Sequence, residues 1–243
     1  MRGAPIVVFM AVLANHAIAQ NSGPPNSTQQ WEACNDPNNL DHVIEACTAV
    51  IDANREPREK LALAFNNRGY AYTRDGQYDR AMADLDRSIK LDPRSALAFN
   101  NRGYAWSRQD QHERAVADFS RAIELEPTYA AAFNNRCWSR AILGDLNDAL
   151  ADCDESLRLR PNAVTTLDSR GFANLKLGRT EQAIADYDAA LQQRPRSPTS
   201  LYGRGVAYLK QSDAEKGKQD VTVAEQIDPD VAAKFRHWGV SGP

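Results

Sequence analysis

The sequence predicts an all-α solenoid, a stack of helical hairpins, and three observations support this fold class. The string AFNNRGYA occurs at 64–71 and again at 98–105, and an altered copy, AFNNRCWS, lies at 132–139. The composition agrees, because 42% hydrophobic residues can form a core and only 13 glycines favour helix. Prolines recur with a period of 34 residues, which identifies a repeat array, at Pro93, Pro127, Pro161, Pro195 and Pro229.

Each repeat is predicted to be a hairpin of two helices. In the first repeat, Phe65, Gly69 and Tyr72 are spaced to share one helix face. Gly76 is suited to end that helix, and a second helix of about 78–91 ends before Pro93 because the residue preceding proline avoids the helical conformation. Such a hairpin has an open apolar face, so only stacking on its neighbours buries it.

The order of residue types in this repeat resembles the tetratricopeptide repeat family. That order is aromatic, glycine, aromatic, glycine, alanine, bulky, small and proline. That resemblance implies a right-handed α-solenoid whose concave face, lined by the first helix of each unit, binds peptides or protein segments. The NNRG variant, with the leading hairpin and the signal sequence, also resembles exported repeat proteins of alphaproteobacteria, whose functions are mostly unassigned. Five units carry the pattern, at 62–95, 96–129, 130–163, 164–197 and 198–231.

Further segments flank the five units. Residues 31–61 are expected to form a shortened leading hairpin and a linker, and residues 230–243 a capping helix and tail that cover the last open face. At the start of the chain, Arg2 precedes an apolar run and Ala19 ends a small-residue motif, which predicts a signal peptide over 1–19. Residues 20–30 are expected to be a flexible lead-in. The apolar run is too short for a stable membrane anchor, so we expect a periplasmic or secreted protein.

Arginines recur inside the first helices, and each is followed 16 residues later by an aspartate. In an antiparallel hairpin these two positions stand at similar height, so a ladder of ion pairs is predicted. The alternative is that the arginines bind an acidic ligand. The predicted pairs are Arg68–Asp84, Arg102–Asp118, Arg136–Asp152, Arg170–Asp186 and Arg204–Asp220.

The four cysteines are expected to form two disulfides, because an even number in an exported chain favours them. Cys137 and Cys153 occupy columns that point into the gap between the two helices of one hairpin. Cys34 and Cys47 stand in similar positions in the shorter leading hairpin. Free buried cysteines are the alternative. The histidines form no ligand spacing with the cysteines, so no metal and no cofactor is predicted.

Polar and aromatic side chains form a stripe beside the packed column of the first helices. Asparagine is a middling helix former, so its recurrence at matched places needs an explanation. Its amide can donate to and accept from a peptide backbone, and the column resembles the asparagine ladder of some family superhelices. The alternative is that the asparagines only bridge neighbouring repeats. The predicted peptide-binding residues are Asn66, Asn67, Tyr70, Asn100, Asn101, Tyr104, Asn134, Asn135 and Trp138.

The asparagine stripe does not continue through all five units. The ladder is interrupted at Ser169 and Gly203, so the last two units are less suited to act as clamps. Neither Tyr104 nor Asn101 belongs to the packed column, so replacing both by alanine is expected to leave the fold intact. The carboxylate clamp of chaperone-binding family members is not reproduced, since Asn66 and Tyr70 occupy places where it uses other residues.

Motifs of catalysis are absent from the sequence, which contains no nucleophile elbow, zinc-protease motif, phosphate loop or dinucleotide fingerprint. The net charge of −3 also gives no basic stripe for nucleic acid. We therefore expect a non-enzymatic scaffold with a protein or peptide partner. The alternatives are a self-assembling structural protein of the cell envelope and an enzyme of unrecognised type. A fold of this kind does not identify the partner.

Overall fold

The computed structural model describes residues 27–36 and 39–241, and in these ranges the chain is helical without strands. The predicted signal peptide, 1–19, lies outside the described residues, as does most of the lead-in. The all-α fold class is confirmed. The helices are α1 (Ser27–Cys34), α2 (Leu40–Ala53), α3 (Arg58–Arg74), α4 (Tyr78–Leu91), α5 (Ala96–Ser107), α6 (His112–Leu125), α7 (Ala130–Leu143), α8 (Leu146–Leu159), α9 (Val164–Lys176), α10 (Thr180–Gln193), α11 (Pro198–Lys210), α12 (Ala214–Ile227) and α13 (Val231–His237).

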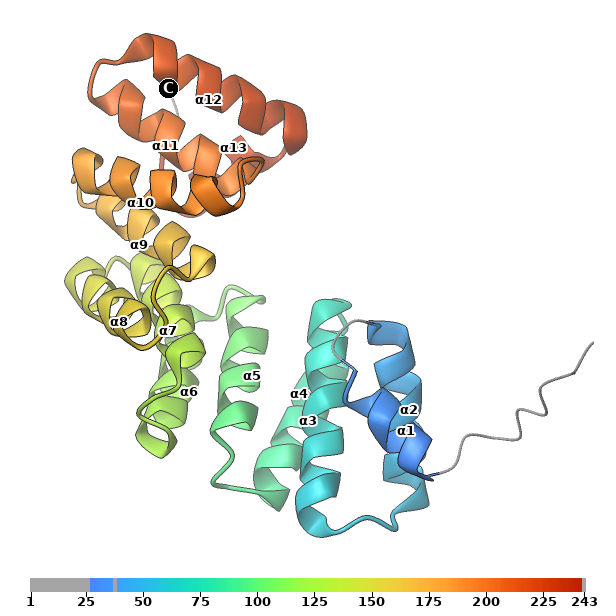
Figure 1. Cartoon of the computed structure of the whole chain (residues 1–243). Helices are drawn as coiled ribbons and strands as arrows, with labels where there is room; N and C mark the ends of the chain where they lie inside the picture. Colours follow the sequence, from blue (N-terminus) through green and yellow to red (C-terminus); the bar gives the residue numbers. More distant parts are fainter. Residues whose placement is uncertain (1–26, 37–38, 242–243) are drawn as a thin grey trace, which may run out of the picture.

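Consecutive helices form hairpins that follow one another along a curved stack (Figure 1). The first helices of neighbouring hairpins contact one another, α3 with α5, α5 with α7, α7 with α9 and α9 with α11. The second helices, α4 to α12, each pack on the first helix of the following hairpin or on α13. Since the first helices share one side of the stack, their exposed side chains line one continuous surface.

In each of the five full hairpins, the turn between the two helices contains one residue with a positive φ, in the left-handed backbone conformation. Glycine, which lacks a Cβ, adopts this conformation without strain at Gly76, Gly144 and Gly178. The turn between α5 and α6 instead uses Asp110, with a φ of 57°, and the turn between α11 and α12 uses Ser212, with a φ of 67°. Aspartate tolerates this region better than most residues, although it still costs energy relative to glycine.

Glycine inside the first helices lets the two helices of a hairpin approach closely. A Cβ at Gly103 would lie 2.7 Å from a ring carbon of Phe119, and one at Gly69 would lie 2.8 Å from Cγ of Leu85. Both Phe119 and Leu85 are fully buried. The mid-helix glycines are therefore explained by packing, which offsets their cost of about 1 kcal/mol relative to alanine.

Both expected disulfides are present in the structure. Cys34 of α1 is bonded to Cys47 of α2, and Cys137 of α7 is bonded to Cys153 of α8. The short hairpin of α1 and α2 packs on α3 through a small core that contains Val43, in addition to the first disulfide. Each disulfide therefore fixes the two helices of one hairpin.

The last helix, α13, packs against the end of the stack beside α11 (Figure 1). Val231 and Phe235 are each only 1% exposed and belong to the same apolar core as residues of α9 and α11. The chain then turns at Gly239, whose φ is 82°. Trp238, immediately before that turn, contacts residues of α7 and α9, so the C-terminal segment also reaches the inner surface of the stack.

Candidate functional site

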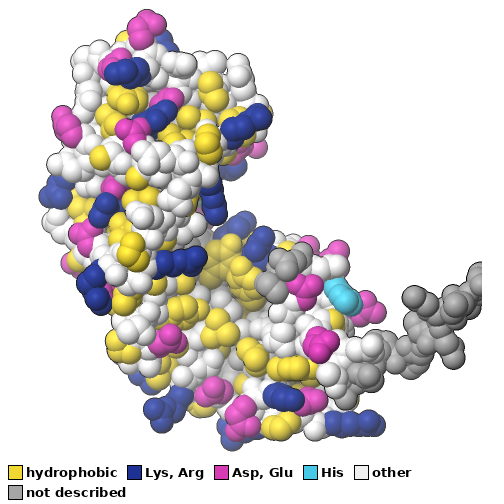
Figure 2. All heavy atoms as spheres, in the orientation of Figure 1, with side chains coloured by type: hydrophobic (Ala, Val, Ile, Leu, Met, Phe, Trp, Pro, Cys, Tyr) yellow, Lys and Arg dark blue, Asp and Glu magenta, His cyan; other side chains and the backbone are white. Residues whose placement is uncertain are grey.

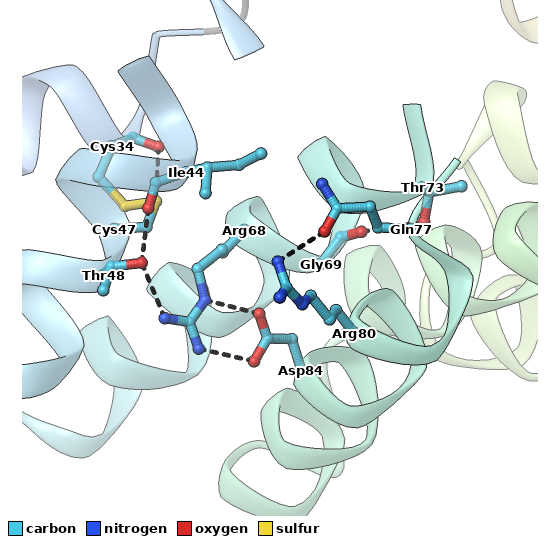
Figure 3. A network of polar contacts seen from close by, with 10 residues as sticks. All are labelled: Cys34, Ile44, Cys47, Thr48, Arg68, Gly69, Thr73, Gln77, Arg80 and Asp84. Carbon is cyan, nitrogen blue, oxygen red and sulfur yellow. Dashed lines mark hydrogen bonds and ion pairs between the residues drawn. A yellow bond between two sulfur atoms is a disulfide. The ribbon is translucent and has the colours of Figure 1, made fainter. Parts of the chain in front are cut away.

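A ladder of ion pairs holds the two helices of every full hairpin together. In each of the five predicted pairs, two guanidinium nitrogens donate to the two carboxylate oxygens of the aspartate, over distances of 2.6–3.1 Å. Figure 3 shows the first of these, Arg68 of α3 with Asp84 of α4. The hydrogen bonding of Arg68 to the carboxylate of Asp84 is also the main cause that raises the pKa of Arg68. The predicted ladder is confirmed.

The same arginines also join each hairpin to the preceding one, which the sequence prediction missed. Nη1 of Arg102 donates to Asp86 of α4 at 2.8 Å, and Nη1 of Arg68 donates to Thr48 of α2 at 2.9 Å (Figure 3). Asp86 lies two residues after Asp84, and residues two apart on a helix face different directions. The carboxylate of Asp84 therefore binds Arg68 of its own repeat, whereas that of Asp86 binds Arg102 of the next repeat. Equivalent bonds run from Arg136 to Ser120, Arg170 to Asp154 and Arg204 to Asp188. With these donors occupied, the arginines are poorly placed to bind an acidic ligand.

The asparagines form a second ladder that runs from repeat to repeat. Nδ2 of Asn101 donates to Oδ1 of Asn66 at 2.9 Å, and Nδ2 of Asn135 donates to Oδ1 of Asn100 at 3.0 Å. At the N-terminal end, Nδ2 of Asn67 donates to the carbonyl of Cys34 at 3.1 Å and to Oδ1 of Asn35 at 2.9 Å. Most of these amide contacts therefore bridge neighbouring repeats, as the alternative to peptide binding expects.

Burial separates the predicted asparagines into two groups. Asn66, Asn100 and Asn101 are buried at 2%, 6% and 7% exposure, so these side chains are part of the stack. Asn101 does not lie outside the packing, because its amide bridges two repeats and is enclosed by them. The expectation that the fold survives its replacement stays a prediction. Asn67 and Asn135 remain half-buried. Their assignment to peptide binding, and that of the rest of the stripe, stays a prediction.

The asparagine ladder stops between α7 and α9. Oδ1 of Asn134 is buried and accepts no hydrogen bond from the described residues. In the preceding hairpins an asparagine of the next repeat donates to this position, but Ser169 stands there instead and donates to the carbonyl of Thr165 at 2.9 Å. The interruption predicted at Ser169 thus leaves one acceptor without a donor.

The aromatic residues of the stripe differ in accessibility. Tyr70 and Tyr104 are half-buried, their ring centroids lie 6.0 Å apart, and their hydroxyls accept hydrogen bonds from Arg74 and Arg108. Trp138 is instead covered in part by the C-terminal segment, since Trp238 packs on it edge to face with 4.9 Å between centroids.

Lys176 of α9 secures the C-terminal segment on this surface. Its Nζ donates to the carbonyl of Trp238 at 3.2 Å and to the carbonyls of Ala141 and Ile142 in α7 at 2.8 and 3.2 Å. Burial lowers the pKa of Lys176. His237 lies 3.2 Å from Asp110 in the turn between α5 and α6. The C-terminal segment is therefore fixed to two earlier hairpins.

Two cavities lie along the inner surface, and Figure 2 shows the molecule hollowed between its two arms, with hydrophobic and basic side chains around the hollow. One cavity, of about 430 Å³, is lined by the first asparagines together with Tyr70, Tyr104 and Leu97. The second, of about 600 Å³, extends from Tyr104 to Trp138, Asp168 and Trp238. The sequence prediction missed Asp168 and Trp238. Asp168 could have been found, because it replaces asparagine in the column of Asn66, Asn100 and Asn134.

Asp168 and His112 both line the second cavity, and the pKa of each is shifted by burial. Burial raises the pKa of Asp168 to about 6, and its Oδ1 accepts a hydrogen bond of 2.5 Å from Ser200. Burial lowers the pKa of His112, whose Nδ1 lies 3.3 Å from Oγ of Ser139. Within 27–36 and 39–241, no group of three or more His, Cys, Asp or Glu residues is placed to hold a metal ion. None of the helices in those ranges has the length and apolar character needed to cross a membrane.

Comparison with known proteins points to one family. A model described as TPR repeat matches residues 69–110 and 173–212, and a model described as Tetratricopeptide repeat matches residues 96–129. Comparison with curated protein sequences gives no match.

Solved structures of the same architecture are similar over most of the chain. The crystal structure of YrrB, described as a TPR protein with an unusual peptide-binding site, is 21% identical with a TM-score of 0.57, over 81% of this chain and 100% of that one. The crystal structure of MamA is 15% identical with a TM-score of 0.58, over 73% and 95%. That of the APC/C hetero-tetramer Cut9–Hcn1 is 16% identical with a TM-score of 0.66, over 87% and 45%. At these identities the likeness establishes the fold.

Proposed function

The chain belongs to the tetratricopeptide repeat family, and from that premise we propose that it is a non-enzymatic scaffold that binds an extended segment of another protein in its concave groove. The observation that carries this proposal is the pair of accessible tyrosines, Tyr70 and Tyr104, above a cavity of about 430 Å³ on the inner surface. Large aromatic side chains contribute much of the binding energy in protein interfaces.

The mode of binding that we propose differs from a simple asparagine clamp. Because the buried asparagines donate to one another, their main contribution is to fix the spacing of the repeats that carry the tyrosines. Asn67 and Asn135 are half-buried and also line the cavity, although Nδ2 of each already donates to a residue of the preceding hairpin. Leu97, 38% exposed, adds an apolar contact beside the tyrosines. YrrB, described as having a peptide-binding site, is consistent with such a role for this fold.

A photocrosslinking experiment tests the proposal. A photoreactive amino acid at position 104 should crosslink the mature protein to a different protein in cell-envelope material, and replacing Tyr70 by alanine should reduce the yield. The matched control is the same photoreactive residue at position 223 on α12, where Val223 is 38% exposed. Crosslinks to a second copy of the chain alone would instead favour a self-assembling structural protein. Equal yields of the same partners from both positions would contradict binding in the groove.

We further propose that the protein is exported to the periplasm or secreted. The two disulfides favour an oxidising compartment, and the first residues have the pattern of a cleaved signal peptide. Intact mass spectrometry of the protein expressed in its native host should give a chain that starts at Gln20. An uncleaved chain found in the cytosol with four free thiols would contradict export.

A further inference from the structure

The cavity of about 600 Å³ lies where the open part of the groove meets the C-terminal segment. Its walls include Trp138 from α7 and Trp238 from the segment after α13, with Tyr104 toward the open side. The two tryptophan rings are packed edge to face, so they form one aromatic corner. A bound segment that runs along the groove past Tyr70 and Tyr104 therefore reaches this aromatic corner before the hairpins that the C-terminal segment covers.

Asp168 is the one aspartate on the first helices α3, α5, α7, α9 and α11, and it makes no ion pair with a described residue. In the hairpin ladder each aspartate accepts two hydrogen bonds from an arginine, as Asp186 does from Arg170. Among the described residues, no Lys, Arg or His side chain lies within ion-pair distance of Asp168, and Arg194 attracts its carboxylate only from farther away. The hydrogen bond that Asp168 accepts comes from the neutral hydroxyl of Ser200. A half-buried carboxylate without a counter-ion is costly unless something else compensates it.

A bridging role explains the hydrogen bond of Asp168 but not its charge. The hydroxyl of Ser200 bonds both Asp168 and Ser197, the residue that caps α11, so Asp168 connects α9 to the start of the next hairpin. Asparagine would accept the same hydrogen bond, and asparagine occupies this column at 66, 100 and 134. The negative charge is thus the feature that the stack itself does not use.

The remaining charged groups of the cavity already have partners. Lys234 pairs with Asp228 at 2.6 Å, and Arg108 donates to the hydroxyl of Tyr104 at 3.4 Å. Asp110 is 3.2 Å from His237, and His112 contacts Ser139. Arg108 is thus a cation with a neutral partner on the Tyr104 side of the cavity, and of the two acidic groups, Asp110 and Asp168, Asp168 is the one that makes no ion pair with a described side chain.

From this arrangement we infer that the cavity receives a basic side chain, lysine or arginine, of the bound segment, with Asp168 as its counter-ion and Trp138 and Trp238 as its walls. Tryptophan faces attract cations, and the apolar stems of lysine and arginine pack well on aromatic rings while the charged end reaches a carboxylate. The inference rests on the proposed function and specifies the chemistry of the partner.

The test uses the mature protein and three blocked pentapeptides, acetylated and amidated so that no terminal charge competes. The sequence Ser-Ala-Lys-Ala-Ser is compared with versions that carry arginine or norleucine at the centre. Proton NMR follows the indole N–H signals, which are assigned by replacing Trp138 and Trp238 one at a time with phenylalanine. The lysine and arginine peptides should shift both signals, and the norleucine peptide should bind about tenfold more weakly or not at all.

Two variants complete the test. Asp168→Asn keeps the hydrogen bond from Ser200 and should weaken the lysine and arginine peptides to the level of norleucine. Asp148→Asn is the matched control, because it removes the same charge from an exposed position on α8 and should change nothing. Equal binding of lysine and norleucine peptides, or no effect of Asp168→Asn, would overturn the inference. If crosslinking at position 104 still captures a partner in that case, the proposed function stands without it, whereas loss of both results would reject the function as well.

Discussion

Nδ2 of Asn101 lies 2.9 Å from Oδ1 of Asn66, and this contact joins the first helices of two consecutive repeats. Both side chains are buried. The two residues occupy neighbouring columns of the repeat, so one is offset from the other by one period and one further residue. The strings of identical sequence therefore have a physical explanation, because the same donor and acceptor must recur for the ladder to continue.

Replacing Asn101 by alanine should destabilise the protein rather than leave it unchanged. The substitution leaves the buried acceptor of Asn66 without its donor, and an orphaned buried polar group costs about 1–3 kcal/mol. Chemical denaturation followed by circular dichroism measures this loss. Asn147→Ala, at an exposed position on α8, is the control and should change the free energy of unfolding by less than about 0.5 kcal/mol. Similar values for the two variants would mean that the ladder contributes nothing.

Arg102 allows a comparison of two carboxylates that bind one guanidinium. The side chain of Asp118 is 9% exposed and accepts two of its hydrogen bonds, whereas that of Asp86 is 60% exposed and accepts one. Breaking a buried pair leaves an uncompensated charge, so Asp118→Asn should lower the free energy of unfolding by about 3 kcal/mol. Asp86→Asn should lower it by less than about 1 kcal/mol, since exposed pairs are screened. Equal losses, measured by urea denaturation, would contradict a ladder in which burial decides the cost.

The disulfide between Cys137 and Cys153 should contribute strongly to stability. It closes a loop with a sequence separation of 16 residues, and on the loop-entropy model such a link is worth roughly 3 kcal/mol. The double variant Cys137→Ser, Cys153→Ser should therefore have a clearly lower Tm, and a reducing agent should lower the Tm of the parent but not of a variant that lacks both disulfides. An unchanged Tm under reducing conditions would show that the links form without constraining the unfolded chain.

Contacts inside one hairpin could be predicted from the sequence, whereas contacts between distant parts of the chain could not. The pair Arg68–Asp84 and the disulfide Cys137–Cys153 each connect two helices across a short turn, so spacing alone places them opposite one another. The contact of Trp238 with Trp138 depends on how the stack curves and on the C-terminal segment returning to it. Periodicity carries no information about either.

The bond from Arg102 to Asp86 is an intermediate case. It joins neighbouring repeats, and it recurs with the same spacing at Arg170 and Asp154. That recurrence is visible in the sequence, but an aspartate two residues away from the one already paired gave no reason to expect a second partner. The stacking of hairpins decides that the same guanidinium faces both.

The charge of Asp168 should make the protein less stable at neutral pH than an asparagine variant. Burial raises the pKa of this carboxyl to about 6 from an ordinary value of 3.8, so between these two pH values the folded protein binds more protons at this site than the unfolded chain. By linkage the free energy of unfolding then falls as the pH rises through this window, and the loss persists above it. A shift of this size, reduced for the partial exposure of the group, corresponds to about 1–2 kcal/mol.

Asp168→Asn should therefore raise the Tm at pH 7 and have almost no effect below the ordinary pKa of the carboxyl. The variant keeps the acceptor for Ser200, so the hydrogen bond to α11 is the same in both proteins. Burial lowers the pKa of His112 in both proteins, so the contribution of His112 cancels in the difference. Thermal unfolding of the two proteins across this pH range is the measurement. A difference that does not depend on pH, or a variant that is less stable at pH 7, would mean that the start of α11 already compensates the charge and that Asp168 needs no cation from a partner.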